Sequence, residues 1–167
     1  PNGGAVYLPA GNYKFENLHV GSNVDVYGDS RSRTFCHTPG SARPMFIVEN
    51  SQNVRIRDLW LVGGGGPAGP QSAVQTAGAL LYASNAQKCQ FTNLQLTNMY
   101  IGIELLGSTN CEVSFVNAYN CYGPAVLKIT GTDSAGPGTG NGGGCYVFKN
   151  QLDMAPYGWP SPGMAAG

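Results

Sequence analysis

The chain has 167 residues, enough for one domain with a sizeable core but too few for two comfortable ones. Lysine plus arginine and aspartate plus glutamate number 9 each, so the formal net charge is zero and gives no electrostatic case for a nucleic acid or a membrane surface as a partner. Charged residues make up 11% of the chain, against about 25% in an ordinary domain, so its surface must consist largely of neutral polar groups.

From residue 23 onward, one five-residue pattern recurs at residues 23–27, 53–57, 88–92, 110–114 and 144–148. Each segment alternates apolar and polar residues, which is typical of a strand with one buried face. The buried positions form two columns: Val24, Val54, Cys89, Cys111 and Cys145, then Val26, Ile56, Phe91, Val113 and Val147. Three of the five cysteines therefore belong to a core column. No cysteine or histidine spacing is typical of a metal site, and we expect no metal and no cofactor.

Two further families of strands follow in register with the first. The second family occupies residues 59–62, 94–97 and 116–119, and buries Leu59, Leu94, Val116, Leu61, Leu96 and Ala118. The third occupies residues 45–48, 79–82, 102–106 and 125–129, and we expect it to bury Phe46, Leu80, Ile103 and Leu127, then Val48, Tyr82, Leu105 and Ile129. In this phase Ile47 and Leu81 point outward on adjacent coils. Exposed aliphatic side chains suggest burial against another chain.

The spacing of the repeat predicts an all-β fold. The five segments start 30, 35, 22 and 34 residues apart, and the shortest spacing suits one coil of three short strands and three turns. We therefore predict a parallel β-helix (solenoid) with three strands per coil and about five to six coils over residues 1–157, followed by a Pro/Gly-rich irregular end at residues 158–167. The excess length lies in three predicted loop insertions, at Ser30 to Pro44, Gly63 to Ala77 and Thr132 to Gly143. A β-sandwich lacks its hairpin signals here, and an α/β fold lacks its helices.

Polar residues recur in the turns of the predicted coils. Asp58 and Asn93 share one turn position, and Asn98 and Asn120 share the next. Side-chain amides at such positions can hydrogen-bond along the stack and to the turn backbone. We assign these residues a structural role.

The opening of the chain carries a more specific motif. The stretch Gly3-Gly-Ala-Val-Tyr-Leu-Pro-Ala-Gly-Asn-Tyr13 resembles the opening of pectate-lyase-like β-helix proteins, in which a GG-x-V-Y-x-P-x-G-x-Y segment leads into the first coils. The resemblance implies a right-handed, single-stranded solenoid. It leaves the chemistry open, because the same opening introduces pectin-degrading enzymes, glucanases, epimerases and bacteriophage tailspikes. The Asp-rich segment that usually precedes it is absent, so we expect the chain to be part of a longer protein.

The acidic residues give no recognisable catalytic constellation. Hydrolysis of a glycan needs two carboxylates roughly 5 to 10 Å apart. Asp25 and Glu112 point outward from the same strand family, but three coils separate them, or about 14 Å. We expect ion pairs between Asp25 and Arg55 and between Glu104 and Lys128. His19 and His37 are isolated in the pattern, so the catalytic residues are unknown and enzymatic activity, by a polysaccharide lyase or a glycoside hydrolase, is left open.

The stronger functional signal is a predicted binding surface. Trp60, Gln95 and Asn117 should stack outward in one column, with Val62, Thr97 and Tyr119 beside them. An aromatic ring offers a face to the C–H groups of a sugar, and amides offer paired partners to its hydroxyls. We therefore predict substrate-binding roles for Trp60, Gln95, Asn117 and Tyr119. The loop from Gly63 to Ala77 walls this surface, or else Trp60 is covered by that loop or by a neighbouring subunit.

These features favour a tailspike-type β-helix that binds, and in one version also depolymerises, the surface polysaccharide of a host cell. Its expected partners are a polysaccharide and, as the resemblance to tailspikes implies, two further copies in a homotrimer; no nucleic acid and no membrane are expected. Its expected location is a virion tail or the extracellular space. One alternative is a secreted bacterial polysaccharide lyase, glycoside hydrolase or epimerase. The other is a structural or adhesive β-helix without catalysis.

Overall fold

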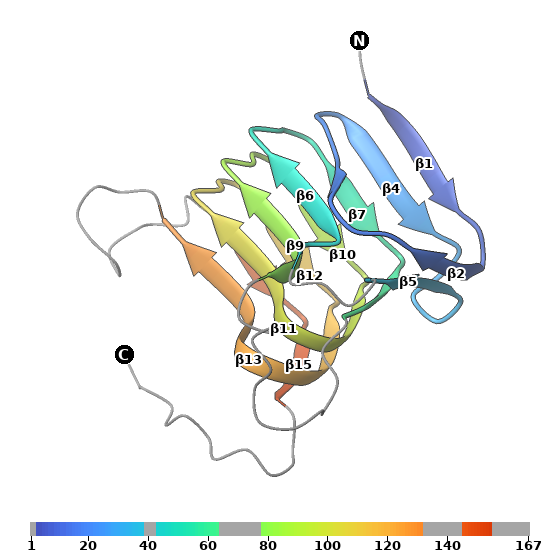
Figure 1. The fold of residues 1–167 in the computed structure, drawn as a ribbon. Helices are drawn as coiled ribbons and strands as arrows, with labels where there is room; N and C mark the ends of the chain where they lie inside the picture. Colours follow the sequence, from blue (N-terminus) through green and yellow to red (C-terminus); the bar gives the residue numbers. More distant parts are fainter. Residues whose placement is uncertain (1–2, 39–42, 64–77, 132–144, 155–167) are drawn as a thin grey trace.

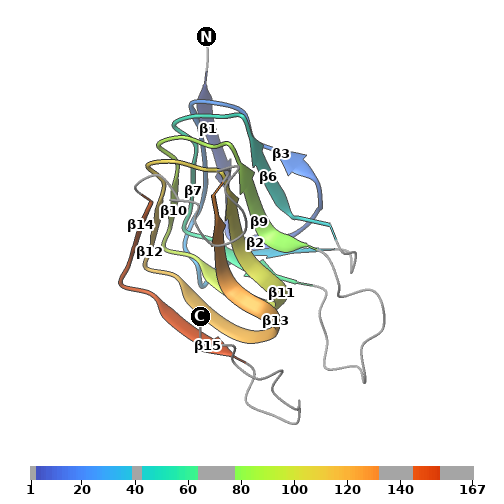
Figure 2. The ribbon, with the colours of Figure 1, turned by 90° about the vertical axis from the view of Figure 1, so that its left-hand side faces the viewer.

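The computed structural model describes residues 3–38, 43–63, 78–131 and 145–154, and in these residues every regular element is a β-strand. The strands run parallel and stack into a solenoid with curled walls, seen from two directions in Figures 1 and 2. No helix in the described residues is long and apolar enough to cross a membrane. The β-helix-like solenoid predicted from the repeat is therefore confirmed at the level of an all-β fold of parallel strands.

The first strand family forms a six-stranded parallel sheet, which we call sheet A. Its strands lie in the order β1 (Gly4–Leu8), β4 (Val24–Gly28), β7 (Arg55–Arg57), β10 (Gln90–Thr92), β12 (Glu112–Ser114) and β14 (Tyr146–Phe148). Phe91 is in register with Ile56 on one side and with Val113 on the other. The two predicted core columns are thus confirmed, and Val147 is 43% exposed because no described strand stacks beyond β14.

The second and third families join into one curled sheet, which we call sheet B. Its second-family strands are β2 (Gly11–Lys14), β5 (Thr34–His37), β8 (Trp60–Val62) and β15 (Gln151–Met154), and its third-family strands are β3 (Leu18–His19), β6 (Phe46–Glu49) and β9 (Ala79–Ser84). Strands β11 (Gln95–Leu106) and β13 (Asn117–Thr130) are long enough to belong to both families. As a result β11 pairs with β8 through its first residues and with β9 through its last.

The prediction of which side chains at residues 79–82 point inward and which point outward was wrong by one position. Leu81 is completely buried and in register with Phe46 and Ile103, whereas Tyr82 lies beside the outward Ile47. Leu80 is also buried, at 4% exposure. The run Ala-Leu-Leu-Tyr-Ala is apolar in both phases, so its alternation could not fix the register. The outward Ile47–Leu81 pair that suggested a trimer contact does not exist.

The segment from Ser30 to Pro44 is not one continuous loop, because it contains strand β5. Cys36 points into the core, in register with Leu61, while Phe35 points outward. The Thr-Phe-Cys-His sequence is too short to stand out from its Pro/Gly/Ser-rich surroundings. The other two predicted insertions fall mainly on residues 64–77 and 132–144, outside the described residues, as does the predicted irregular end at residues 158–167.

The turn residues form ladders, as predicted. The Asn93 amide donates to Asp58 at 2.6 Å, and the Asn120 amide donates to Asn98 at 3.2 Å. Further amide pairs join Asn53 to Asn23 at 3.0 Å and Asn85 to Asn50 at 3.3 Å, which the sequence analysis did not anticipate. All of these residues have positive φ. Asparagine and aspartate tolerate this left-handed conformation better than other non-glycine residues, which explains their recurrence in one-residue corners.

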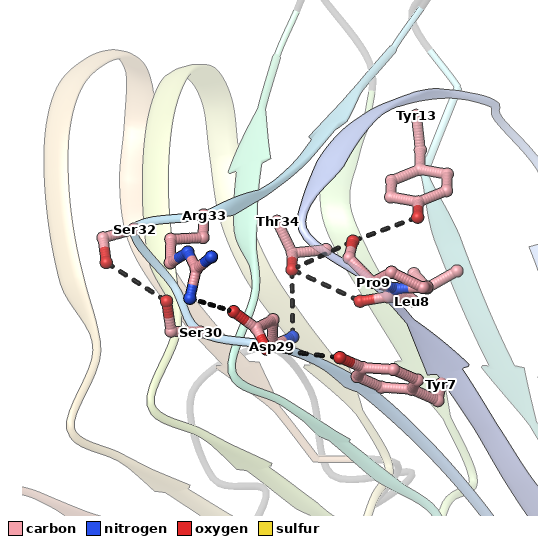
Figure 3. A network of polar contacts seen from close by, with 9 residues as sticks. All are labelled: Tyr7, Leu8, Pro9, Tyr13, Asp29, Ser30, Ser32, Arg33 and Thr34. Carbon is pink, nitrogen blue, oxygen red and sulfur yellow. Dashed lines mark hydrogen bonds and ion pairs between the residues drawn. The ribbon is translucent and has the colours of Figure 1, made fainter.

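The opening motif makes hydrogen bonds within the first coil and to the second (Figure 3). The Tyr13 hydroxyl donates to the carbonyl of Pro9 at 3.0 Å, and the Tyr7 hydroxyl donates to Asp29 at 3.2 Å. The Thr34 hydroxyl lies under the same corner and accepts a hydrogen bond from the Asp29 N–H at 3.0 Å. The motif therefore has a structural explanation that involves no catalysis.

Candidate functional site

Strands β8, β11 and β13 bring the predicted binding residues together on the outer face of sheet B. Gln95 is in register with Trp60 on one side and with Asn117 on the other. Their flanking neighbours Leu59, Leu61, Leu94 and Leu96 are completely buried, so alternation sends the three side chains outward. Beside them, Thr97 is in register with Val62 and Tyr119. The geometry of the site is as predicted, while its binding role stays a prediction.

The sequence analysis missed the continuation of this surface toward the N-terminus. Phe35 is in register with Trp60, and Asn12 with Phe35. We call the whole row the outward column; it consists of Asn12, Phe35, Trp60, Gln95, Asn117 and Gln151. The row beside it, the flanking column, consists of Lys14, His37, Val62, Thr97 and Tyr119. The alternation of residues 34–37 was the signal that could have revealed Phe35.

Two aromatic rings lie side by side in the outward column. The ring centroids of Phe35 and Trp60 are 4.9 Å apart, with the planes tilted by 41°. The Trp60 indole N–H donates to the Thr97 hydroxyl at 2.8 Å, and Thr97 is only 9% exposed. The indole ring is therefore held by a neighbour on each side. Its polar edge is already satisfied, so what it can offer a ligand is the exposed part of its apolar surface.

The two amides next to Trp60 have unused hydrogen-bonding capacity. Gln95 and Asn117 are half-buried, and no polar group in the described part of the chain hydrogen-bonds their side-chain amides, although their backbone N–H groups are paired within the sheet. Each amide carries two donors and an acceptor oxygen with two lone pairs. The Tyr119 side chain is half-buried in the flanking column and adds a hydroxyl. This arrangement can receive the hydroxyls of a ligand while an apolar part of the ligand covers the rings.

Asp25 and Glu104, the two acidic residues predicted to form ion pairs, both have a basic partner. Asp25 forms an ion pair with Arg57 at 2.9 Å, whereas the predicted partner was Arg55. Arg55 is in backbone register with Asp25, but Arg57 reaches it from two positions further along β7 and also contacts Asp58 at 2.7 Å. The predicted pair Glu104–Lys128 is confirmed. The predicted Asp25–Arg55 pair was wrong because the arginine side chain is long enough to reach a diagonal neighbour on the next strand as easily as the residue directly opposite.

The remaining candidates for catalysis gain no support. Asp25 and Glu112 are three register steps apart in sheet A, or about 14 Å, too far for a catalytic pair. The prediction that His19 is isolated was wrong, because its imidazole lies 3.9 Å from the Glu49 carboxylate. His37 lies 3.3 Å from the Asn12 side-chain oxygen. Among the described residues, no group of three or more His, Cys, Asp or Glu side chains is placed to hold a metal ion.

The cysteines are free thiols, and four of the five are buried. Burial raises the pKa of Cys36 to about 12 and also raises the pKa of Cys121 and Cys145. The pKa of Cys111 is raised by its side-chain hydrogen bond to Cys89 and by burial, whereas the same hydrogen bond lowers the pKa of Cys89 to about 7. The four thiols with a raised pKa stay protonated, and protonated thiols are poor nucleophiles. The prediction that Cys89, Cys111 and Cys145 stack as reduced thiols in the core agrees with this arrangement, except that Cys145, at the end of the stack, is half-buried.

No family model matches the chain, and no curated protein sequence matches it. Solved structures do. The catalytic domain of a GH87 alpha-1,3-glucanase in complex with tetrasaccharides is similar with a TM-score of 0.55 and 14% identity, over 90% of this chain and 34% of the glucanase domain. A protein described as a glycosyl hydrolase from Parabacteroides merdae is similar with a TM-score of 0.54 and 11% identity, over 91% of this chain and 83% of that one.

The chain shares a fold with these proteins. It spans about a third of the length of the glucanase catalytic domain, and identities this low establish the fold alone. The likeness confirms the parallel solenoid predicted from the repeat. It leaves the choice of function to the outer surface of this chain.

Proposed function

We propose that this solenoid binds a polysaccharide through its outward column. One observation carries the proposal: a pair of adjacent aromatic rings, Phe35 and Trp60, continues directly into two half-buried amides, Gln95 and Asn117, that have no polar partner in the described residues. A sugar is the ligand that presents both an apolar C–H face and hydroxyls along its length. A ring that the sheet already orders loses little further entropy when a sugar docks on it.

The structural neighbours that bind or act on carbohydrates support this proposal by analogy. The glucanase catalytic domain was solved with tetrasaccharides, and the related nigerose complex is similar to this chain with a TM-score of 0.52 at 17% identity. Fold analogy alone is a weak guide to function. The main support for the binding proposal is therefore the arrangement of side chains in the outward column.

The finer proposal is a right-handed β-helix of five to six coils, of the tailspike type, that acts as a homotrimer on a virion tail or in the extracellular space. Its support is the neutral polar surface, with 11% charged residues, and the half-buried Ile47 and Tyr82 on adjacent strands β6 and β9. Light scattering tests it: a heat-resistant trimer supports a tailspike, and a monomer supports a secreted enzyme. Assays for new reducing ends and unsaturated uronates, after incubation with bacterial surface polysaccharides, separate an enzyme from an adhesin.

The binding proposal is tested with a Trp60→Ala variant against a panel of polysaccharides in affinity electrophoresis and calorimetry. We expect at least one polysaccharide to bind the native chain, and Trp60→Ala to weaken that binding by about 1 kcal/mol or more, the scale of a good aromatic contact. The matched control is Tyr146→Ala, which removes a 63% exposed ring from the outer face of sheet A. A folded Trp60→Ala protein with unchanged affinity, or a native chain that binds no member of the panel, contradicts the proposal.

A further inference from the structure

The outward column contains no charged residue. Its members are asparagine, glutamine, phenylalanine and tryptophan, at the positions defined above. In the flanking column the one side chain with a fixed charge is Lys14, and it is two register steps from Val62 on the strand of Trp60. Neither column contains a carboxylate. In these two columns, a ligand that covers Trp60, Gln95 and Asn117 therefore meets neutral groups only.

Four of the five arginines, the side chains that would pair best with a carboxylate, are engaged by other groups of the chain or project from sheet A. Arg57 is held by Asp25 and Asp58, and Arg33 is held by Asp29. Arg31 donates to the carbonyl of Phe115 at 3.1 Å, and Arg55 projects from β7 in sheet A. Recognition of a uronate normally uses the paired donors of an arginine. A carboxylate placed against the Trp60 ring would lose water without gaining such a partner.

The hydrogen-bonding character of the amides also distinguishes the two kinds of sugar. A hydroxyl both donates and accepts, so it can satisfy the N–H groups and the oxygen of an amide together. An ionised carboxylate only accepts, so it can use the N–H groups of Gln95 and Asn117 but not their oxygens. These amides are half-buried, so a ligand that covers an oxygen without donating to it displaces the water there and loses affinity.

Building on the glycan-binding role proposed above, we propose that the outward column selects a neutral glycan and rejects uronate-rich chains. From Phe35 to Asn117 the column spans three register steps, or about 14 Å, along the solenoid axis. The glycan lies along this axis. Its most apolar sugar face covers Phe35 and Trp60, and the hydroxyls of the following sugars meet Gln95 and Asn117.

The test compares neutral glucans with the same glucans oxidised at C6 to glucuronans, so that linkage and chain length stay constant. We expect at least a ten-fold preference for the neutral member of whichever pair binds. We also expect its affinity to be the same at low and high salt, because no ion pair contributes. A Lys14→Ala variant should bind the neutral glucan as the native chain does.

A positive charge introduced into the outward column should shift the preference from the neutral glucan toward its glucuronan. Gln95→Arg is expected to lose affinity for the neutral glucan and to gain affinity for its glucuronan. The matched control is Gln90→Arg, which makes the same change on the outer face of sheet A, beside Glu112, and should leave the preference unaltered.

The outcomes separate this inference from the proposed function. If neither form of any glucan binds the native chain, the binding proposal itself fails. If the glucuronan binds as well as or better than the glucan and binding still depends on Trp60, the glycan site stands and neutral selection is wrong. Loss of binding in Lys14→Ala, together with weakening by salt, also overturns neutral selection.

Discussion

The outer faces of the two sheets are built on the same coils, yet they treat their polar groups in opposite ways. On sheet A, Arg57 binds Asp25 and Asp58 and lies 4.4 Å from the centroid of the Tyr27 ring. On the face formed by β5, β8, β11 and β13, the amides of Gln95 and Asn117 meet no partner in the described residues. On sheet A the Arg57, Asp25 and Asp58 side chains bind one another, whereas the Gln95 and Asn117 amides of the outward column have their donors and acceptors available for a ligand.

This difference indicates which of the two surfaces is better evidence for a ligand-binding site. A satisfied ion pair costs a ligand the energy of breaking it, so the conspicuous charges of sheet A are weak evidence for a site. A half-buried amide without a partner is a small standing cost to the folded chain, which a ligand can remove.

The largest effect is expected from Val113→Asp, because the alternation around Val113 separates the core from the outer face of sheet A. Val113 is 1% exposed and lies in register between Phe91 and Val147. An aspartate there would bury an unpaired charge and cost several kcal/mol of unfolding free energy. Urea denaturation measures the loss. The control is Thr92→Asp, which puts the same charge outward beside Arg57 and should cost well under 1 kcal/mol.

A soluble Val113→Asp protein with an unchanged denaturation midpoint would contradict the inward assignment of the whole column. It would also undermine the outward column, whose direction rests on the same alternation.

The second effect concerns the core behind sheet B, at Cys36. Burial raises the pKa of Cys36 to about 12, so the folded chain keeps a proton that the unfolded chain releases above its ordinary pKa of about 8.5. Stability contributed by this group is therefore complete below pH 8.5 and falls as the pH rises toward 12, by up to about 1.4 kcal/mol per pH unit.

Urea denaturation at pH 8 and pH 10 checks this expectation in the native chain and in Cys36→Ala. The variant is less stable at both pH values because it leaves a cavity, but it should lose less stability between them. Equal losses in the two proteins would show that Cys36 ionises freely in the folded state.

Much of the fold could be predicted from the sequence because burial on one side of a strand leaves a period of two. Columns such as Val26–Ile56–Phe91 and Leu61–Leu96 were readable for that reason. The prediction failed where the pattern is uniform, at residues 79–83, since apolar residues in both phases leave the register undetermined. It also failed at β5, where four residues of strand lie within a loop-like composition.

The candidate site could be predicted in part for the same reason. Alternation pointed Trp60, Gln95 and Asn117 outward, and the register then brought them together. Phe35 was missed because its strand was missed. The hydrogen bond from Trp60 to Thr97 and the diagonal pairing of Asp25 with Arg57 depend on side-chain rotamers, which no sequence period encodes.

The contrast between the two faces is tested directly by the matched pair Arg57→Leu and Gln95→Leu. Removing Arg57 leaves Asp25 and Asp58 without their common partner, and we expect a loss of about 1 kcal/mol, limited because the guanidinium is partly exposed. Removing Gln95 breaks no side-chain hydrogen bond in the described residues, so stability should change by less than about 0.5 kcal/mol. Glycan affinity should respond in the reverse order.

Thermal melting and calorimetry with a bound oligosaccharide measure the two responses. If Gln95→Leu proves the more destabilising change, its amide has a structural partner and is not reserved for a ligand. If Arg57→Leu proves the change that reduces glycan affinity, the binding face is sheet A.

The smallest effect is expected at the corner before β10, where Lys88 breaks a column of asparagines. Asn23, Asn53, Lys88 and Asn110 occupy equivalent corners with positive φ, and φ is 54° at Lys88. A left-handed residue other than glycine, asparagine or aspartate costs about 1–2 kcal/mol, and asparagine recovers part of this cost. Lys88→Asn should therefore stabilise the chain by about 0.5–1 kcal/mol and raise the melting temperature by about 1–4 °C.

The reciprocal change Asn110→Lys should lower the melting temperature by a similar amount. Neither change should alter glycan affinity, because both residues lie at the corner leading into sheet A and outside the outward column. A lower melting temperature in Lys88→Asn would mean that the Lys88 side chain makes a stabilising contact worth more than the backbone strain it imposes.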